Sequence, residues 1–149
     1  MLLLIIKVLH IACAAVWWGV PMSMSRDIRV TVPLGEPHWE LLMIRVNRTR
    51  LIAIGAGLAT ILSGVMLILL FGGFASVPIA IHIGFGLAFC LLLSEVFWES
   101  SVWGMLVKQL ESKEDADVLN RQVRKFSVIG GVQHTLWFCI LVLMVFRYV

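Results

Sequence analysis

Closely spaced cysteine pairs are missing from this sequence. Its three cysteines, Cys13, Cys90 and Cys139, all lie in apolar stretches and form no CxxC motif. A disulfide framework or a structural zinc site is therefore not expected. We interpret the cysteines as buried free thiols that act as small apolar residues.

Signatures of nucleotide-dependent and hydrolytic enzymes are also missing. The sequence has no nucleotide-binding motif, no recognisable nucleophile–base pair and no metalloprotease signature. Residues 1–6 lack the basic region and small-residue cleavage site of a removable signal peptide, so we expect the first apolar segment to remain in the mature protein. The net charge of +3 gives no indication of nucleic-acid binding.

Apolar residues are what the chain has in abundance. They make up 60% of its 149 residues, and the mean hydropathy is +0.98. Soluble domains contain roughly 45–50% apolar residues, so this composition indicates an integral membrane protein. Segments 2–24, 51–71, 77–103 and 126–146 are long enough to cross a bilayer. We expect one all-α domain over residues 1–149, an up-down-up-down four-helix transmembrane bundle.

Basic residues are concentrated in two of the three connections between these segments. Ten of the twelve lysines and arginines lie in or beside the first and third connections, whereas residues 72–77 contain none. Positive charge marks the cytoplasmic side, so both charged connections are expected there and both termini outside. The expected setting is a bacterial inner membrane, with membrane lipid as the surrounding partner.

A histidine in the first apolar segment is the starting point for function. His10 is costly in a bilayer unless its ring nitrogens are satisfied, so it is a candidate functional residue. Seven residues along a helix return to nearly the same face, which places Trp17 on the same stripe, with Cys13 and Ala14 between them. This set would suit haem b, with His10 on the iron. Alternatively, His10 is bonded to a carbonyl of a neighbouring helix.

Two other histidines could supply a second axial ligand. At 1.5 Å per residue, His10 and His82 lie roughly 12 Å and 8 Å below the outer boundary, and His134 roughly 18 Å below it. His10 and His82 therefore match best, on diagonal helices of the bundle, whereas His134 requires tilted helices. Trp137 would add to the wall of the cofactor site with Trp17.

A possible parallel internal repeat supports the same pair of histidines. Residues 9–12, Leu-His-Ile-Ala, resemble residues 81–84, Ile-His-Ile-Gly. If the two halves are related by an axis along the membrane normal, His10 and His82 occupy equivalent depths.

Two acidic residues in the third apolar segment are the other candidates for chemistry. Glu95 and Glu99 lie one helical turn apart on its cytoplasmic half. They could relay protons, bind a cation, or pair with Arg45, Arg48 or Arg50 from before the second segment. All three interpretations remain open.

The first segment carries a resemblance to a known family. Residues 7–11, Lys-Val-Leu-His-Ile, followed by Trp17 and Gly19, resemble the opening helix of the superfamily that contains HemJ-type protoporphyrinogen oxidase and the copper-resistance CopD domain. The resemblance implies a haem-associated four-helix membrane protein and carries over His10 alone as a haem ligand. The sequence departs from HemJ-type proteins at the start of the third segment, which lacks their lysine.

The leading hypothesis is therefore a haem b membrane protein for electron transfer, alone, as a homo-oligomer or as a small subunit of a redox complex. Two alternatives belong to other classes. One is a cofactor-free structural subunit whose histidines only bond between helices. The other is a protoporphyrinogen-oxidase-like or copper-handling protein, with His10, Met22 and Met24 as a weak set of copper ligands.

Overall fold

The computed structural model describes residues 1–145, and these fold into helices joined by short turns. The elements follow in the order α1 (Leu2–Gly19), η1 (Val20–Ser23), α2 (Met24–Thr31), η2 (Val32–Leu34), α3 (His38–Leu70), η3 (Phe74–Ser76), α4 (Ile79–Leu93), η4 (Ser94–Glu99), α5 (Ser100–Glu111) and α6 (Ala116–Val145). Four helical segments are long and apolar enough to cross a membrane, at Leu2–Leu34, His38–Leu70, Ile79–Glu111 and Ala116–Val145. The expectation of an all-helical protein with four such segments is confirmed.

The first connection differs most from expectation. The sequence predicts that the first apolar segment ends at residue 24, but helical structure continues through α2 and η2 to Leu34. Pro21 has no N–H to donate, and the chain accommodates it in the 3₁₀ turn η1 before the α-helix resumes. The helix stops at Gly35, whose φ of 75° is a conformation that glycine adopts most easily.

The last helix begins well before the apolar span predicted for it. Its first backbone bonds run from the N–H groups of Val118 and Leu119 to the carbonyl of Asp115. The helix therefore starts about three turns before the expected apolar span at Phe126. The expected end of that span at Phe146, and the outward placement of Arg147, lie outside the described residues.

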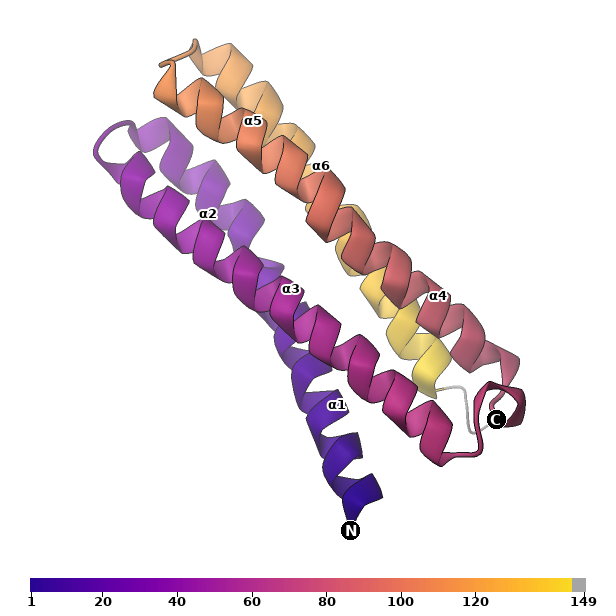
Figure 1. The fold of residues 1–149 in the computed structure, drawn as a ribbon. Coiled ribbons are helices and arrows are strands. Elements are labelled where there is room, and N and C mark those ends of the chain that lie inside the picture. Colours follow the sequence, from indigo (N-terminus) through magenta and orange to yellow (C-terminus); the bar gives the residue numbers. More distant parts are fainter. Residues whose placement is uncertain (146–149) are drawn as a thin grey trace.

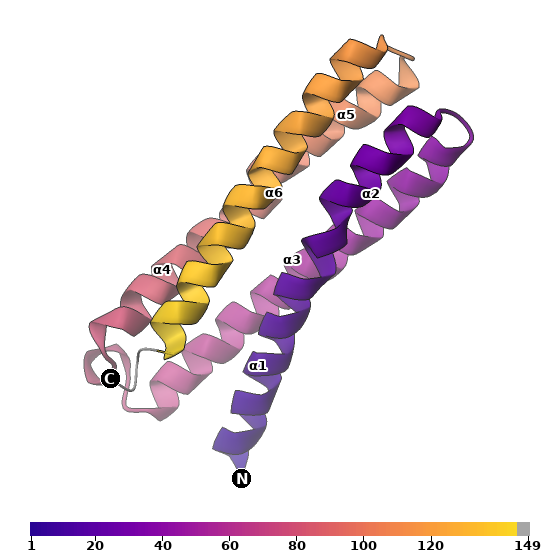
Figure 2. The same cartoon turned by 180° about the vertical axis from the view of Figure 1, so that it is seen from behind.

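The helices are arranged as two long hairpins that lie side by side (Figures 1 and 2). In one hairpin α1 and α2 pack against α3, and in the other α4 and α5 pack against α6. The N-terminus and the α3–α4 connection lie at one end of the molecule, whereas the α2–α3 and α5–α6 connections lie at the other (Figure 1). Contacts of α2 with α6 and of α3 with α4 join the two hairpins.

Buried side chains form two clusters along the hairpins. The larger cluster lies toward the α2–α3 and α5–α6 connections and contains Met24, Ile28, Val32, Leu42, Val46, Val102, Trp103, Leu106, Leu110, Leu119, Val123, Phe126 and Ile129. The smaller cluster contains Trp17, Ala53, Ala88, Leu91, Leu92 and Ile140. All four apolar segments contribute to both clusters. The first segment enters the larger cluster through α2 and η2, and the smaller one through Trp17 of α1.

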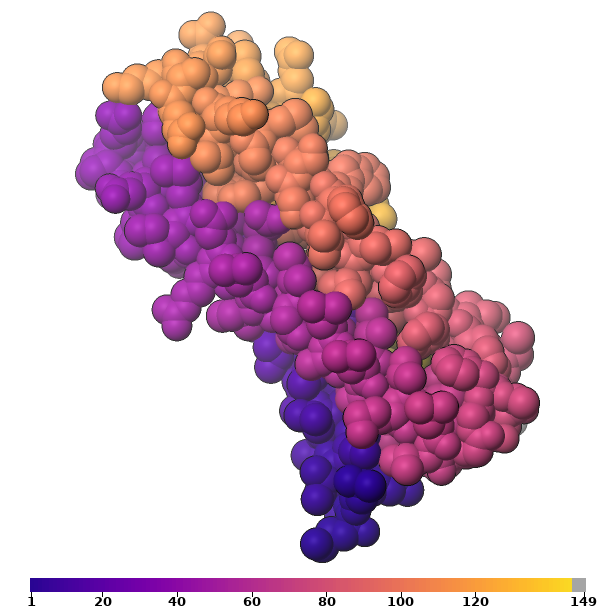
Figure 3. Space-filling view, in the orientation of Figure 1, coloured from indigo at the N-terminus to yellow at the C-terminus, as the bar shows by residue number. Residues whose placement is uncertain are grey.

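The beginning of α1 has few buried residues. Ile6 and Trp17 are its only buried side chains, whereas Leu4 and Ile11 are 65% and 67% exposed. Figure 3 shows this end of the chain lying against α3 with much of its surface uncovered. Apolar side chains exposed along a whole helix are what a lipid environment accommodates and water does not.

The cysteines correct one expectation. Cys13 is partly buried, but Cys90 and Cys139 are exposed on the outer faces of α4 and α6. The interpretation of all three as buried thiols is therefore wrong for these two. Each lies on a helix that packs along only part of its circumference, and hydropathy alone does not tell a face that meets a neighbouring helix from one that meets lipid.

Two glycines of α3 let α1 approach closely. A Cβ atom added at Gly57 would lie 2.8 Å from Trp17 Cε2 and 3.0 Å from Leu92 Cδ1. At Gly64 it would lie 3.3 Å from His10 Cε1. The stripe of α1 that carries His10 and Trp17 thus packs on a glycine stripe of the same seven-residue spacing, as small residues between membrane helices allow.

Gly57→Ala is expected to lower the free energy of unfolding by about 1–3 kcal/mol, because the added methyl group overlaps a buried indole that cannot move freely. Gly55→Ala is the control, since nothing lies within 4 Å of a Cβ atom there and alanine is the better helix former. Thermal unfolding of both variants in the same detergent, followed by circular dichroism, measures the difference. Equal stability of the two variants would contradict the close contact.

Candidate functional site

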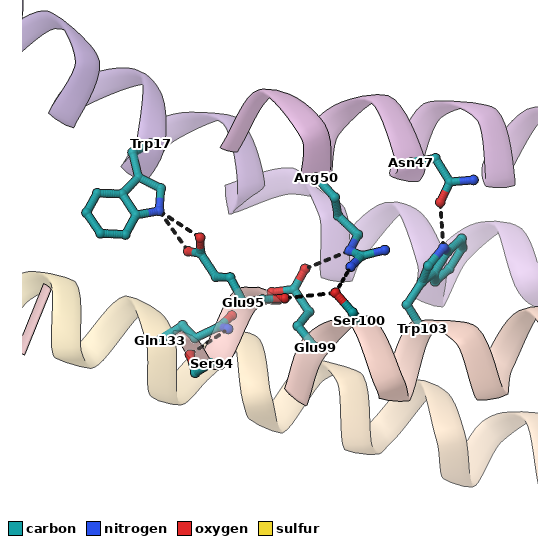
Figure 4. A network of polar contacts seen from close by, with 9 residues as sticks. All are labelled: Trp17, Asn47, Arg50, Ser94, Glu95, Glu99, Ser100, Trp103 and Gln133. Atoms are coloured by element: carbon teal, nitrogen blue, oxygen red, sulfur yellow. Dashed lines mark hydrogen bonds and ion pairs between the residues drawn. The ribbon is translucent and has the colours of Figure 1, made fainter. Parts of the chain in front are cut away.

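A network of polar side chains is buried between the helices near the middle of the molecule (Figure 4). Its acidic members, Glu95 and Glu99, are 7% and 5% exposed. Both lie in η4, a π-helical segment between α4 and α5. π-helical segments are rare and are frequent at functional sites, because the wider turn redirects side chains. Here the distortion carries both carboxylates of the site.

Glu95 is held by a tryptophan of the first hairpin. The indole Nε1 of Trp17 donates to both carboxylate oxygens of Glu95, at 2.9 Å and 2.8 Å. Trp17 also meets Trp137 of α6 edge to face, with 5.7 Å between the ring centroids. The two tryptophans predicted to line one site are therefore in contact, but Trp17 serves as a hydrogen-bond donor to a carboxylate. The predicted pairing of Glu95 with an arginine is not the contact that it makes.

Glu99 does pair with an arginine. Arg50 Nε lies 3.5 Å from Glu99 Oε1, and the Arg50 guanidinium also donates to the Ser100 hydroxyl. Of the three arginines considered from the sequence, Arg50 is the partner, while Arg45 pairs with Asp27 at 3.2 Å near the surface. The buried network therefore contains two carboxylates and one guanidinium.

The fourth segment completes the network with neutral groups and a histidine. Gln133 of α6 donates from Nε2 to the Ser94 hydroxyl at 3.2 Å. His134, the next residue, interacts electrostatically with Glu99. On the other side, Trp103 Nε1 donates to Asn47 Oδ1 at 2.8 Å. The network thus connects all four apolar segments.

His10 is hydrogen-bonded to α3, the helix that packs against α1 in the first hairpin. Its Nδ1 lies 3.0 Å from the Thr60 carbonyl oxygen and 3.0 Å from Ser63 Oγ. A carbonyl can only accept, so this bond requires the proton on Nδ1 and leaves the Nε2 lone pair available. Ser63 can accept from His10 because its own hydroxyl donates to the Ala59 carbonyl at 2.7 Å.

This geometry matches both interpretations of His10 from the sequence. A bond to a carbonyl of a neighbouring helix is present, as the structural interpretation expected. The same bond is also what orients metal-binding histidines, which donate the other ring N–H to a carbonyl and keep Nε2 for the metal. His10 therefore fits the donor chemistry of an axial haem ligand.

The hydrogen bonds of the other two candidate histidines run to carbonyls four positions earlier in the chain. His82 Nδ1 lies 3.2 Å from the Pro78 carbonyl oxygen, and His134 Nδ1 lies 2.6 Å from that of Gly130. His82 is exposed, and its ring is 6.1 Å from that of Phe74. Both bonds favour the tautomer with a free Nε2, but neither fixes the ring against a second helix.

The positions of the three histidines along the long axis of the molecule can be measured from Trp17, which contacts both η4 and α6. At 1.5 Å per residue, His10 lies about 10 Å from this level toward the N-terminal end, and His82 about 20 Å in the same direction. His134 lies about 5 Å in the opposite direction. His82 is therefore closer in level to His10 than His134 is, but the structure does not bring His10 and His82 into one contact.

The copper-ligand set suggested from the sequence does not converge. Met22 and Met24 follow His10 on a nearly continuous helical path, at least roughly 18 Å farther along at 1.5 Å per residue. Met24 is buried in the larger core cluster and Met22 is exposed. Within residues 1–145, no group of three or more His, Cys, Asp or Glu side chains is placed to hold a metal ion.

The Trp17–Glu95 bond was the main feature missed from the sequence. A buried indole N–H needs an acceptor, and a buried carboxylate needs a donor, so each residue was a signal for the other. The pairing was not predicted because the two residues are 78 positions apart in the sequence. The fold and site define a helical protein, suited to a membrane, with a charged network buried between its spans. Comparison of the chain with family models, curated proteins and solved structures finds no match.

Proposed function

We propose that this protein binds haem b through His10 and transfers electrons within a membrane. The observation that supports the proposal is the bond from His10 Nδ1 to the Thr60 carbonyl and Ser63 hydroxyl, which leaves Nε2 free. The resemblance of residues 7–19 to the HemJ and CopD superfamily supports the same residue. Haem, when bound, supplies one-electron redox chemistry, and the protein supplies the ligand, its orientation and dry surroundings.

The chain's own contribution would begin at the His10 ring. Thr60 and Ser63 hold the ring against α3, so its ligand nitrogen is pre-oriented before any iron binds. Acceptors at Nδ1 would also make the imidazole a stronger electron donor toward a bound iron. Gly64 provides the room for this close approach.

The proposed membrane arrangement follows the distribution of basic residues. The four apolar segments would run up-down-up-down, with the α2–α3 and α5–α6 connections in the cytoplasm and both termini outside. A bacterial inner membrane is the proposed location. The exposed apolar side chains of α1 would face lipid, another redox subunit or a second copy of the chain.

His82 is the proposed second axial ligand, because it lies closer to the level of His10 than His134 does. His82→Ala should then convert a low-spin haem to a high-spin one, whereas His134→Ala should leave the spectrum nearly unchanged. Absorption and electron paramagnetic resonance spectra of the two purified variants make the comparison. Low-spin haem that survives His82→Ala and is lost in His134→Ala would assign the ligand to α6 instead.

Ser63→Ala tests the bond that carries the proposal. It removes one of two acceptors at His10 Nδ1 while the Thr60 carbonyl remains, so haem should stay bound. The midpoint potential should rise, because a less strongly hydrogen-bonded imidazole donates less charge to oxidised iron. Redox titration measures the shift. An unchanged potential would show that Ser63 is not hydrogen-bonded to a histidine that ligates haem.

A cofactor-free structural subunit is the second candidate, and it is favoured by the same His10 bond viewed as a link between α1 and α3. This candidate predicts that His10 variants change stability alone. It also predicts that the protein purifies without porphyrin at any expression level.

A further inference from the structure

We propose that the buried network around Glu95 is a proton-binding site, in which the Glu95 carboxyl carries one proton taken from water at neutral pH. The inference concerns the chain's own residues and does not depend on haem binding. The helices enclose the charged side chains of Glu95, Glu99 and Arg50 (Figure 4).

Charge balance in the network is incomplete. Glu95 and Glu99 are each more than nine-tenths buried, and the Arg50 guanidinium pairs with Glu99. With both carboxylates ionised, the net charge would be −1. An unpaired charge away from water costs several kcal/mol, and a group in that position neutralises by binding a proton instead. One proton from water brings the network to zero.

The groups that face the carboxylates from every neighbouring helix leave few places for this proton. From α1, Trp17 contributes a neutral indole N–H, and from α6, Gln133 contributes a neutral amide. Arginine stays protonated in proteins and cannot accept it. His134, which interacts with Glu99, is the remaining titratable neighbour. We place the proton on the carboxylates, whose two negative charges exceed the single positive charge of Arg50.

Glu95 is the preferred holder of the two carboxylates. Glu99 has a guanidinium at 3.5 Å, which favours its ionised form. Glu95 has one neutral N–H donor that is divided between its two oxygens, at 2.9 Å and 2.8 Å. A neutral carboxyl keeps that bond on one oxygen and carries the proton on the other. The geometry thus assigns the proton to Glu95, because the Arg50 guanidinium pairs with Glu99 instead.

The site also has room for proton exchange. A cavity of about 10 Å³ lies beside the two carboxylates, close to the volume that one water molecule needs. It is lined by Pro21, Arg50, Ala53, Ile54, Glu95 and Glu99. Arg50 Nε is buried and makes no hydrogen bond within the described part of the chain. A water in this position would join Glu95, Glu99 and the guanidinium, so that the proton can pass between the carboxyls.

Infrared spectroscopy of the full-length protein in lipid nanodiscs tests the assignment. A protonated carboxyl has a C=O stretch well separated from that of a carboxylate, and the band shifts in D₂O. The wild type should show this band at pH 7, and Glu95→Gln should lose it. Glu40→Gln is the control, because Glu40 is exposed on the first turn of α3 and its removal should leave the band in place.

Trp17→Phe provides a second measurement that leaves both carboxylates in place. Loss of the Trp17 donor should keep the band but move it to higher frequency, as expected for a carboxyl that has lost a hydrogen bond. A wild-type spectrum without a protonated carboxyl at pH 7 would overturn the proposal. A band that persists in Glu95→Gln, or one that Trp17→Phe leaves unmoved, would overturn its assignment to Glu95.

Discussion

Replacement of His10 by alanine is expected to reduce the haem content of the purified protein by roughly tenfold or more, a loss of at least about 1.4 kcal/mol of binding free energy. His10 is the histidine whose ring is fixed by a second helix, through Thr60 and Ser63, and its free Nε2 is the proposed iron ligand. Haem per chain, measured by the pyridine haemochrome spectrum, gives the result.

The control for this variant is His38→Ala. His38 is exposed at the first residue of α3, near the α2–α3 connection, and should not affect haem content. His10→Ala also removes a hydrogen bond between helices, at a cost to stability of about 1 kcal/mol. Haem content should therefore be compared in samples that are folded by circular dichroism. Full haem content in folded His10→Ala protein would show that another residue is the ligand.

Arg50→Ala is expected to lower the free energy of unfolding by about 3–5 kcal/mol, because it leaves a buried carboxylate without its partner. The matched control is Arg45→Ala. Its ion pair with Asp27 has a similar distance, 3.2 Å, but the side chains are 56% and 34% exposed. An exposed pair contributes about 0–1 kcal/mol. Thermal unfolding in one detergent at pH 7 compares the two.

The cost of Arg50→Ala should also depend on pH. As the pH falls, protonation removes the unpaired negative charge of Glu99, so the difference from the wild type should become smaller. Replacing Arg50 and Glu99 together by methionine should recover much of the stability, since no buried charge is then left alone. Equal losses for Arg50→Ala and Arg45→Ala would show that burial does not strengthen the inner pair.

The coarse fold followed from the sequence because it depends on composition. Four runs of apolar residues have no alternative to long helices in a bilayer, where every backbone N–H must bond within its own segment. The shared face of His10 and Trp17 followed from helical periodicity, and both residues do pack against α3. The continuation of the helix past Pro21 was not predicted, because a proline usually ends or kinks an α-helix. Here Pro21 lies in a 3₁₀ turn, after which the helix continues.

The partners of the polar residues could not be derived in the same way. Choosing Arg50 over Arg45 for Glu99 requires the relative rotation of α3 and η4, which local sequence does not encode. The π-helical turn at Glu95 changes which side of the helix a residue faces. The 3.6-residue periodicity of an α-helix therefore does not predict the directions of the two buried carboxylates. The position of His82 on an exposed face depends in turn on how the hairpins pack.

The most direct test of the account is the absorption spectrum of the purified wild-type protein, before and after reduction with dithionite, together with haem per chain. Haem binding through His10 predicts a Soret band, with resolved α and β bands on reduction if His82 is the second ligand. It also predicts a haem content approaching one per chain when haem is supplied during expression. Folded protein that shows neither band under these conditions would contradict the proposed function and favour a structural role for His10.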